Sequence, residues 1–185
     1  LDFKNGALKR HYDQSPQMNF SNLPMPRKDL LPKFSYISKN TIQATFGCPY
    51  RCDFCAVIST QKKYLRRPVE DVIKEISEMN GNFVTFVDPS PMEDKRYIKR
   101  LLREMIPLKK MWGGLATVKI GDDEELMDLC AESGCKGLLI GFESVEQDAL
   151  VEINKKFNVV EKYRNLCTRL HERGIAINGT FIFGM

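Results

Sequence analysis

Short apolar runs alternate with amphipathic segments along most of the chain, and the two patterns predict different elements. Strands are predicted at residues 41–46, 83–87, 114–118, 137–142 and 175–183. Helices are predicted at 68–79, 94–106, 122–134 and 159–173, with a short helix after Ser144. This alternation indicates an α/β fold built of parallel βα units. Such units close into a partial barrel or form a twisted open sheet, and the periodicity does not choose between them.

Residues at the predicted boundaries agree with these limits. Pro68 suits the first position of a helix because its fixed φ is already helical. Asp122 with Glu125 resembles a capping box. Ser144 with Gln147 is expected to cap the short helix in the same way.

The first 35 residues differ from the rest of the chain. They are rich in proline and polar residues, which predicts a linker or leader at 1–35 followed by a core domain at 36–185. The net charge of +4 also belongs to this part, since residues 1–39 hold seven Lys and Arg against three Asp and Glu. There is no dense basic run and no aromatic interleaving, so no clear nucleic-acid surface is expected.

Composition limits the class of protein. A chain of 185 residues with 43% hydrophobic residues predicts one globular domain. No apolar stretch approaches the roughly 18–20 residues needed to span a bilayer, so no transmembrane segment is expected. Six cysteines in such a chain are expected to be reduced, which favours a cytoplasmic location.

The chemistry of the chain is concentrated in three cysteines that follow the first predicted strand. Cys48, Cys52 and Cys55 place three thiolates within eight residues. Iron–sulfur clusters are ordinarily closed by four cysteines, so three leave a coordination position for another ligand. The alternative is a non-catalytic iron–sulfur or zinc-binding module, which requires a fourth protein ligand. Cys130, Cys135 and Cys167 share no ligand spacing, and Cys130 and Cys167 fall on helix patterns as small buried hydrophobes.

The motif resembles that of the radical S-adenosylmethionine (radical SAM) enzymes, Cys-x-x-x-Cys-x-aromatic-Cys. Residues 48–55 read Cys-Pro-Tyr-Arg-Cys-Asp-Phe-Cys, and Phe54 fills the aromatic position. The resemblance implies that the three cysteines hold a [4Fe–4S] cluster whose fourth iron is chelated by SAM. It covers about residues 41–185 and implies a partial (βα)6 barrel. Residues 179–185 look like the start of the family's fifth-strand motif, so we expect a fragment truncated after the fifth strand.

The resemblance also implies contacts with SAM at the carboxyl ends of the strands, where Asp88, Thr117, Glu143 and Gly184 are expected to share one rim. Glu143 lies in a Gly-Phe-Glu-Ser segment similar to the family's fourth-strand signature, whose acid contacts the SAM ribose or amino group. It is otherwise an ordinary loop glutamate. At the end of the second strand many relatives have Gly-Gly-Glu, whereas this chain has Asp88. Either Asp88 or neighbouring backbone carbonyls would take the methionyl amine.

The remaining implied contacts come from the second half of the chain. Lys155 matches a basic position that pairs with the SAM carboxylate in relatives, although Lys156 could serve instead, and both could be surface lysines. Ile182 and Phe183 would line the adenine pocket or simply belong to the strand core. Phe54 would contact adenine or pack in the core.

The implied activity is reductive cleavage of SAM. An external flavodoxin- or ferredoxin-like protein would supply the electron, and a 5′-deoxyadenosyl radical would abstract hydrogen from a small-molecule substrate. Residues 23–32 resemble the segment that joins a cobalamin domain to the barrel in the cobalamin-associated subgroup. Cobalamin would then bind a missing N-terminal domain, and methyl transfer and oxidative cyclisation are both outcomes found in that subgroup.

Overall fold

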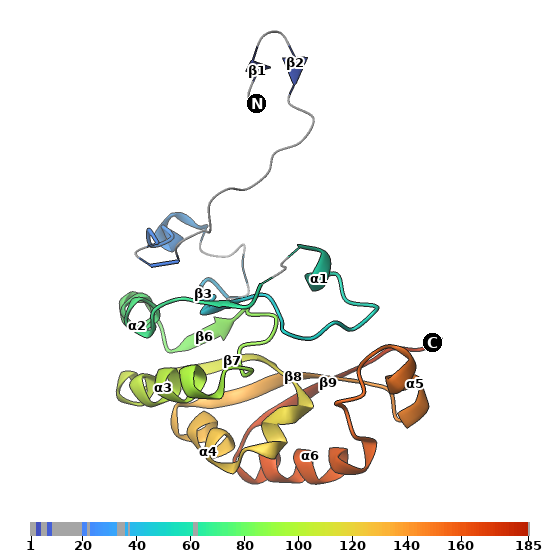
Figure 1. The fold of residues 1–185 in the computed structure, drawn as a ribbon. Coiled ribbons are helices and arrows are strands. Elements are labelled where there is room, and N and C mark those ends of the chain that lie inside the picture. Colours follow the sequence, from blue (N-terminus) through green and yellow to red (C-terminus); the bar gives the residue numbers. More distant parts are fainter. Residues whose placement is uncertain are drawn as a thin grey trace.

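A five-stranded parallel sheet forms the centre of the fold (Figure 1). The computed structural model describes residues 3–4, 7–8, 20–21, 23–32, 36, 38–60 and 63–184. The sheet has the order β3-β6-β7-β8-β9, and every pairing in it is parallel. Its strands are β3 (Thr41–Ile42), β6 (Phe83–Phe86), β7 (Met111–Ala116), β8 (Cys135–Glu143) and β9 (Ala176–Phe181). The predicted α/β class and the succession of parallel strands are confirmed.

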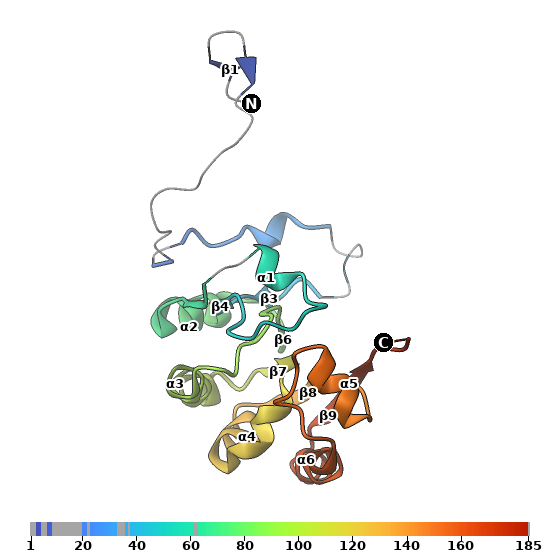
Figure 2. The same ribbon diagram turned by 45° about the vertical axis from the view of Figure 1, so that its right-hand side comes forward.

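Four helices cover one face of this sheet in an arc that Figure 2 shows almost end on. They are α2 (Val69–Glu78), α3 (Lys95–Met105), α4 (Glu124–Glu132) and α6 (Tyr163–Glu172). Each helix buries one apolar stripe against the strands, and fully buried side chains such as Ile76, Leu101 and Leu126 form one continuous core. Two shorter helices, α1 (Val57–Thr60) and α5 (Gln147–Glu152), lie at the carboxyl ends of the strands (Figure 1).

The remaining elements are short. The 3₁₀ turns are η1 (Lys28–Leu30), η2 (Ile106–Leu108), η3 (Val118–Asp122) and η4 (Val160–Lys162). Four two-residue strands form two antiparallel pairs, β1 (Phe3–Lys4) with β2 (Ala7–Leu8) and β4 (Thr45–Phe46) with β5 (Leu65–Arg66).

The prediction of one strand over residues 41–46 was wrong in its second half. Only β3 belongs to the main sheet, whereas β4 turns away and pairs with β5. The backbone N–H groups of Ala44 and Thr45 donate to the carboxylate of Asp88 instead of to a neighbouring strand. A buried acceptor at the end of β6 therefore redirects the chain just before the cysteine motif.

The predicted helix starts were shifted by one or two residues. Asp123, not Asp122, caps α4, and its Oδ1 accepts from the backbone N–H of Leu126. Ser144 accepts from the N–H of Glu146 outside α5 and does not cap that helix. Pro68 is the N-cap of α2, not its first helical residue. Such shifts are expected because several polar residues near a helix start can accept the free N–H groups.

Strand β7 begins at Met111, three residues before the predicted strand. Gly113 and Gly114 interrupt the apolar run and hid this start, since glycine has low strand propensity. Trp112 is nevertheless buried, and its indole N–H donates to Ser133 Oγ at 3.0 Å.

The face of the sheet that the helices leave uncovered has a floor of small residues. Gly113, Gly137 and Ala176 lie side by side in register on three strands. Parallel barrels usually fill this position with bulky branched side chains. Here a hollow of about 380 Å³ remains over this floor.

Part of the predicted leader packs on the core. Lys28 Nζ lies 2.8 Å from the carboxylate of Glu75 on α2, and Arg67 contacts the other oxygen of the same carboxylate at 2.8 Å. Glu75 is buried, so two cations neutralise a charge that would otherwise be costly to bury. The division between a leader at 1–35 and a core at 36–185 stays a prediction.

Candidate functional site

The cysteine loop, residues 47–55, leaves β4 at the carboxyl end of the sheet. It begins at Gly47, whose φ is +79° and whose position could not hold a Cβ atom, because that atom would lie 2.4 Å from the carbonyl oxygen of Lys63. Cys52 is buried, whereas Cys48 and Cys55 are half-buried. All three are free cysteines.

The three thiols lie near one another. Burial raises the pKa of Cys48 and of Cys52, and negative charge on the neighbouring cysteines raises each of them further. Yet no three His, Cys, Asp or Glu side chains among the described residues lie close enough to bind one metal ion. A [4Fe–4S] cluster takes one thiolate per iron, so three cysteines within eight residues can each bind a different iron. The chemistry of this donor set is compatible with such a cluster.

An ion pair closes the carboxyl end of β8. Lys155 Nζ lies 2.6 Å from Glu143 Oε1, and both side chains are about nine-tenths buried. Glu143 has a φ of +66°, which is uncommon for a residue other than glycine and turns its carboxylate back over the sheet. Gly141 makes room for the pair, since a Cβ atom there would lie 2.3 Å from Glu143 Oε1.

Two more of the predicted SAM contacts, Phe54 and Ile182, lie beside this pair. Lys155 Nζ lies 5.7 Å from the centre of the Phe54 ring and favours the thiolate form of Cys52. The backbone N–H of Ile182 donates to the carbonyl of Glu143 at 2.9 Å, which brings the end of β9 to the same place. The structure therefore gathers Phe54, Glu143, Lys155 and Ile182 beside the cysteine loop. It leaves Lys156 exposed.

Asp88 is placed differently. Its side chain is completely buried, and its Oδ1 accepts from the N–H of Ala44 at 2.9 Å, from the hydroxyl of Thr45 at 2.7 Å and from the N–H of Thr45. Its Oδ2 is buried without a partner among the described residues. The carboxylate is thus directed into the base of the cysteine loop and not toward Glu143.

Glu93 is a rim residue that the sequence did not single out. It accepts hydrogen bonds from Tyr50 in the cysteine loop, from Ser90 Oγ at 3.1 Å and from Thr117 Oγ1 at 2.9 Å. One carboxylate thus joins the cysteine loop to the ends of two strands. Because Glu93 stands just before α3, it looks in the sequence like an ordinary acid at a helix start.

Comparison with known proteins identifies the family. The radical SAM superfamily profile matches residues 42–185. The chain belongs to the radical SAM superfamily. The resemblance seen in the cysteine motif is thereby confirmed.

Several curated relatives of this radical SAM chain are named methyltransferases. Bacteriochlorophyllide d C-12(1)-methyltransferase of Chlorobaculum tepidum is 32% identical over 100% of this chain and 43% of its own length. Cytidylyl-2-hydroxyethylphosphonate methyltransferase of Streptomyces wedmorensis is 30% identical over 75% of this chain and 27% of its own length. The chain thus spans less than half the length of these relatives.

Solved structures confirm the partial radical SAM barrel. The radical SAM methyltransferase TsrM of Kitasatospora setae, described with cobalamin and a [4Fe–4S] cluster bound, superposes with a TM-score of 0.71 at 23% identity, over 79% of this chain and 31% of its own. The cobalamin-dependent radical SAM enzyme OxsB superposes with a TM-score of 0.68 at 17% identity, over 77% of this chain and 23% of its own. At these identities the likeness establishes the fold.

Within the described part of this chain, no helix has the length and apolar character needed to cross a bilayer.

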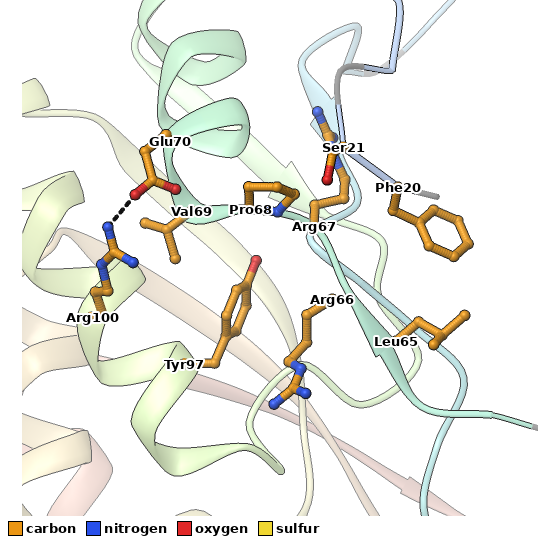
Figure 3. A pocket seen from close by; sticks show the side chains of 10 residues that line it. All are labelled: Phe20, Ser21, Leu65, Arg66, Arg67, Pro68, Val69, Glu70, Tyr97 and Arg100. Atoms are coloured by element: carbon orange, nitrogen blue, oxygen red, sulfur yellow. Dashed lines mark hydrogen bonds and ion pairs between the residues drawn. The ribbon is translucent and has the colours of Figure 1, made fainter. Parts of the chain in front are cut away.

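A separate hollow of about 520 Å³ is lined by residues of β5, α2 and α3 together with Phe20 and Ser21, and the three motif cysteines are not among the lining residues (Figure 3). Three arginines line it, but each has an acidic partner: Arg66 pairs with Asp94, Arg67 with Glu75 and Arg100 with Glu70. Figure 3 shows the Arg100–Glu70 pair at one side. With these charges already neutralised, we assign the hollow no binding role.

The burial of Asp88 predicts an unusual pH dependence of stability. Burial raises the pKa of this carboxyl from 3.8 to about 6, so the folded chain holds a proton there that the unfolded chain has lost. The stabilisation is present below about pH 4 and disappears as the pH rises through 6. We expect the free energy of unfolding of the wild-type chain, relative to Asp88→Asn, to fall by about 2 kcal/mol between pH 4 and pH 7. Urea unfolding of the cluster-free chains measures this, and a constant difference would contradict it.

Proposed function

We propose that this chain is the core of a radical SAM enzyme, with Cys48, Cys52 and Cys55 as ligands of a [4Fe–4S] cluster. The observation that carries the proposal is the meeting of the cysteine loop with the Glu143–Lys155 pair at the carboxyl rim of the sheet. A carboxylate and an ammonium side by side suit a zwitterion, because each can exchange its internal partner for a group of opposite charge on the ligand. SAM carries both an ammonium and a carboxylate on its methionyl part.

We assign the SAM contacts as follows. Glu143 accepts from the ribose or the amino group, Lys155 pairs with the carboxylate, and Phe54 and Ile182 contact the adenine. Of the two candidates for the amine, Asp88 and its neighbouring backbone carbonyls, the carbonyls are favoured because the Asp88 side chain is completely buried and its Oδ1 is bound by Ala44 and Thr45. When bound, the cluster and SAM supply a 5′-deoxyadenosyl radical. The chain holds and orients them and excludes water from the rim.

For the whole protein we propose methyl transfer to a small-molecule substrate, with cobalamin bound outside this chain. Support comes from the methyltransferase names of the relatives and from the cobalamin-dependent neighbours. An external electron donor and a cytoplasmic location stay predictions. In the full-length protein, SAM with a deuterated methyl group should give deuterated methylcobalamin, which mass spectrometry detects. Absence of that species would exclude cobalamin as the methyl carrier.

Anaerobic reconstitution tests the core of the proposal. We expect about four irons and four sulfides per chain and an EPR spectrum of the reduced cluster that changes when SAM is added. The rival, a closed iron–sulfur or zinc-binding module, predicts a spectrum that ignores SAM, or zinc in place of iron. Either result would reject the radical SAM assignment for this chain.

A further inference from the structure

The turn that follows α5, residues 153–157, contacts the cysteine loop at three points although about 100 residues separate them. Asn154 Nδ2 donates to the carbonyl of Arg51 at 2.7 Å. The backbone N–H of Asp53 donates to the carbonyl of Ile153 at 3.1 Å. The rings of Tyr50 and Phe157 stack with their centres 4.1 Å apart. Two polar contacts and one aromatic contact thus join the same two segments.

The turn itself is held firmly on β8. Asn158 is completely buried, and its Nδ2 donates to the carbonyls of Gly141 and Phe142 at 3.0 Å each. Asn154 has a φ of +57°, a conformation that asparagine tolerates better than most residues. The Asn154 side chain is exposed, so its contact with the cysteine loop is not explained by burial of the side chain. The turn is therefore a rigid support that reaches the cysteine loop through Asn154 and Phe157.

The same turn holds Lys155 between these two contacts. Lys155 is bonded to Glu143, lies over Phe54 and affects the pKa of Cys52. Without the contacts of Asn154 and Phe157, the loop could shift relative to the Glu143–Lys155 pair while both remained folded. The turn therefore contributes to the spacing between the cysteines and that pair, alongside the hydrogen bond from Tyr50 to Glu93.

We propose that Asn154 and Phe157 are positioning residues, which fix the cysteine loop at the distance from the Glu143–Lys155 pair that lets one SAM molecule reach both. The consequence for SAM rests on the proposed function, whereas the anchoring of the loop does not. Neither residue touches the cluster in this assignment. Both act through the placement of Cys52 and Phe54.

Asn154→Asp tests this, because aspartate keeps the size and tolerates the positive φ but cannot donate to the Arg51 carbonyl. In the cluster-free chain we expect amide hydrogen exchange of residues 50–55 to become about tenfold faster. In the reconstituted chain we expect SAM to bind about tenfold more weakly, with a smaller SAM-induced change in the EPR spectrum and unchanged iron content. Asn82→Asp, an exposed position before the amino end of β6, is the matched control and should behave as wild type.

Phe157 provides an independent pair of variants. Phe157→Tyr keeps the stacked ring and should retain wild-type SAM affinity, whereas Phe157→Leu should weaken SAM binding as Asn154→Asp does. Wild-type exchange and SAM affinity in Asn154→Asp would overturn the proposal, and so would faster exchange with unchanged SAM affinity. If the wild-type chain assembled no SAM-responsive cluster, the proposed function would fail, while the exchange measurement would still decide whether the turn anchors the loop.

Discussion

Replacing Cys52 by serine is expected to abolish the SAM-responsive cluster and to lower SAM cleavage by at least about 1,000-fold. Cys52 is the buried member of the motif and lies near Lys155, whose ammonium stands over the Phe54 ring. A serine hydroxyl stays protonated at neutral pH and is a poor iron ligand, so one corner of the cluster loses its anchor. Iron counting, EPR and chromatographic detection of 5′-deoxyadenosine measure the effect.

Cys167→Ser is the matched control. Cys167 is a half-buried cysteine on α6, outside the motif, and the same substitution there should leave iron content and SAM cleavage within about twofold of wild type. Equal losses in both variants would indicate a general loss of folding. A Cys52→Ser chain with a full, SAM-responsive cluster would remove this cysteine from the ligand set.

Breaking the Glu143–Lys155 pair is expected to lower both the free energy of unfolding and the affinity for SAM. The two effects have different causes and can be measured separately. Glu143→Gln leaves the Lys155 ammonium buried without a counter-charge. Lys155→Met likewise leaves the Glu143 carboxylate buried without a counter-charge. We expect each single variant to lower the free energy of unfolding by about 3 kcal/mol, and the double variant by about 1 kcal/mol, because it buries no unpaired charge. Urea unfolding of the cluster-free chains measures all three.

The double variant regains stability relative to the single variants, but it should not regain SAM binding. The double variant lacks both charged groups, so its SAM affinity should stay at least about 100-fold below that of wild type after reconstitution. The surface pair Lys162–Asp122 is the control, since Lys162→Met with Asp122→Asn should change stability by less than about 0.5 kcal/mol and leave SAM affinity unchanged. Wild-type SAM affinity in the double variant would exclude both residues as SAM contacts.

The elements of the fold and the cysteines proposed as cluster ligands could be found in the sequence because their signals are local. Apolar periodicity reports which face of a strand or helix is buried, and this located all five strands of the main sheet to within a few residues. The trio Cys48, Cys52 and Cys55 lies within eight residues, so spacing alone makes it visible. Resemblance to relatives added Glu143, Lys155, Phe54 and Ile182, which the structure places together.

Tertiary structure alone decided which way the side chains face and what holds the loop. The same strand-end position can present Asp88 to the rim or to the backbone of Ala44 and Thr45, and only the fold selects the second. The contact between Asn154 and Arg51 has no sequence signature, because a backbone carbonyl accepts equally well in any residue. The amino-acid order therefore determined which residues could bind a cluster. Contacts between segments distant in the sequence, each of which contributes little free energy, decided where those residues lie in space.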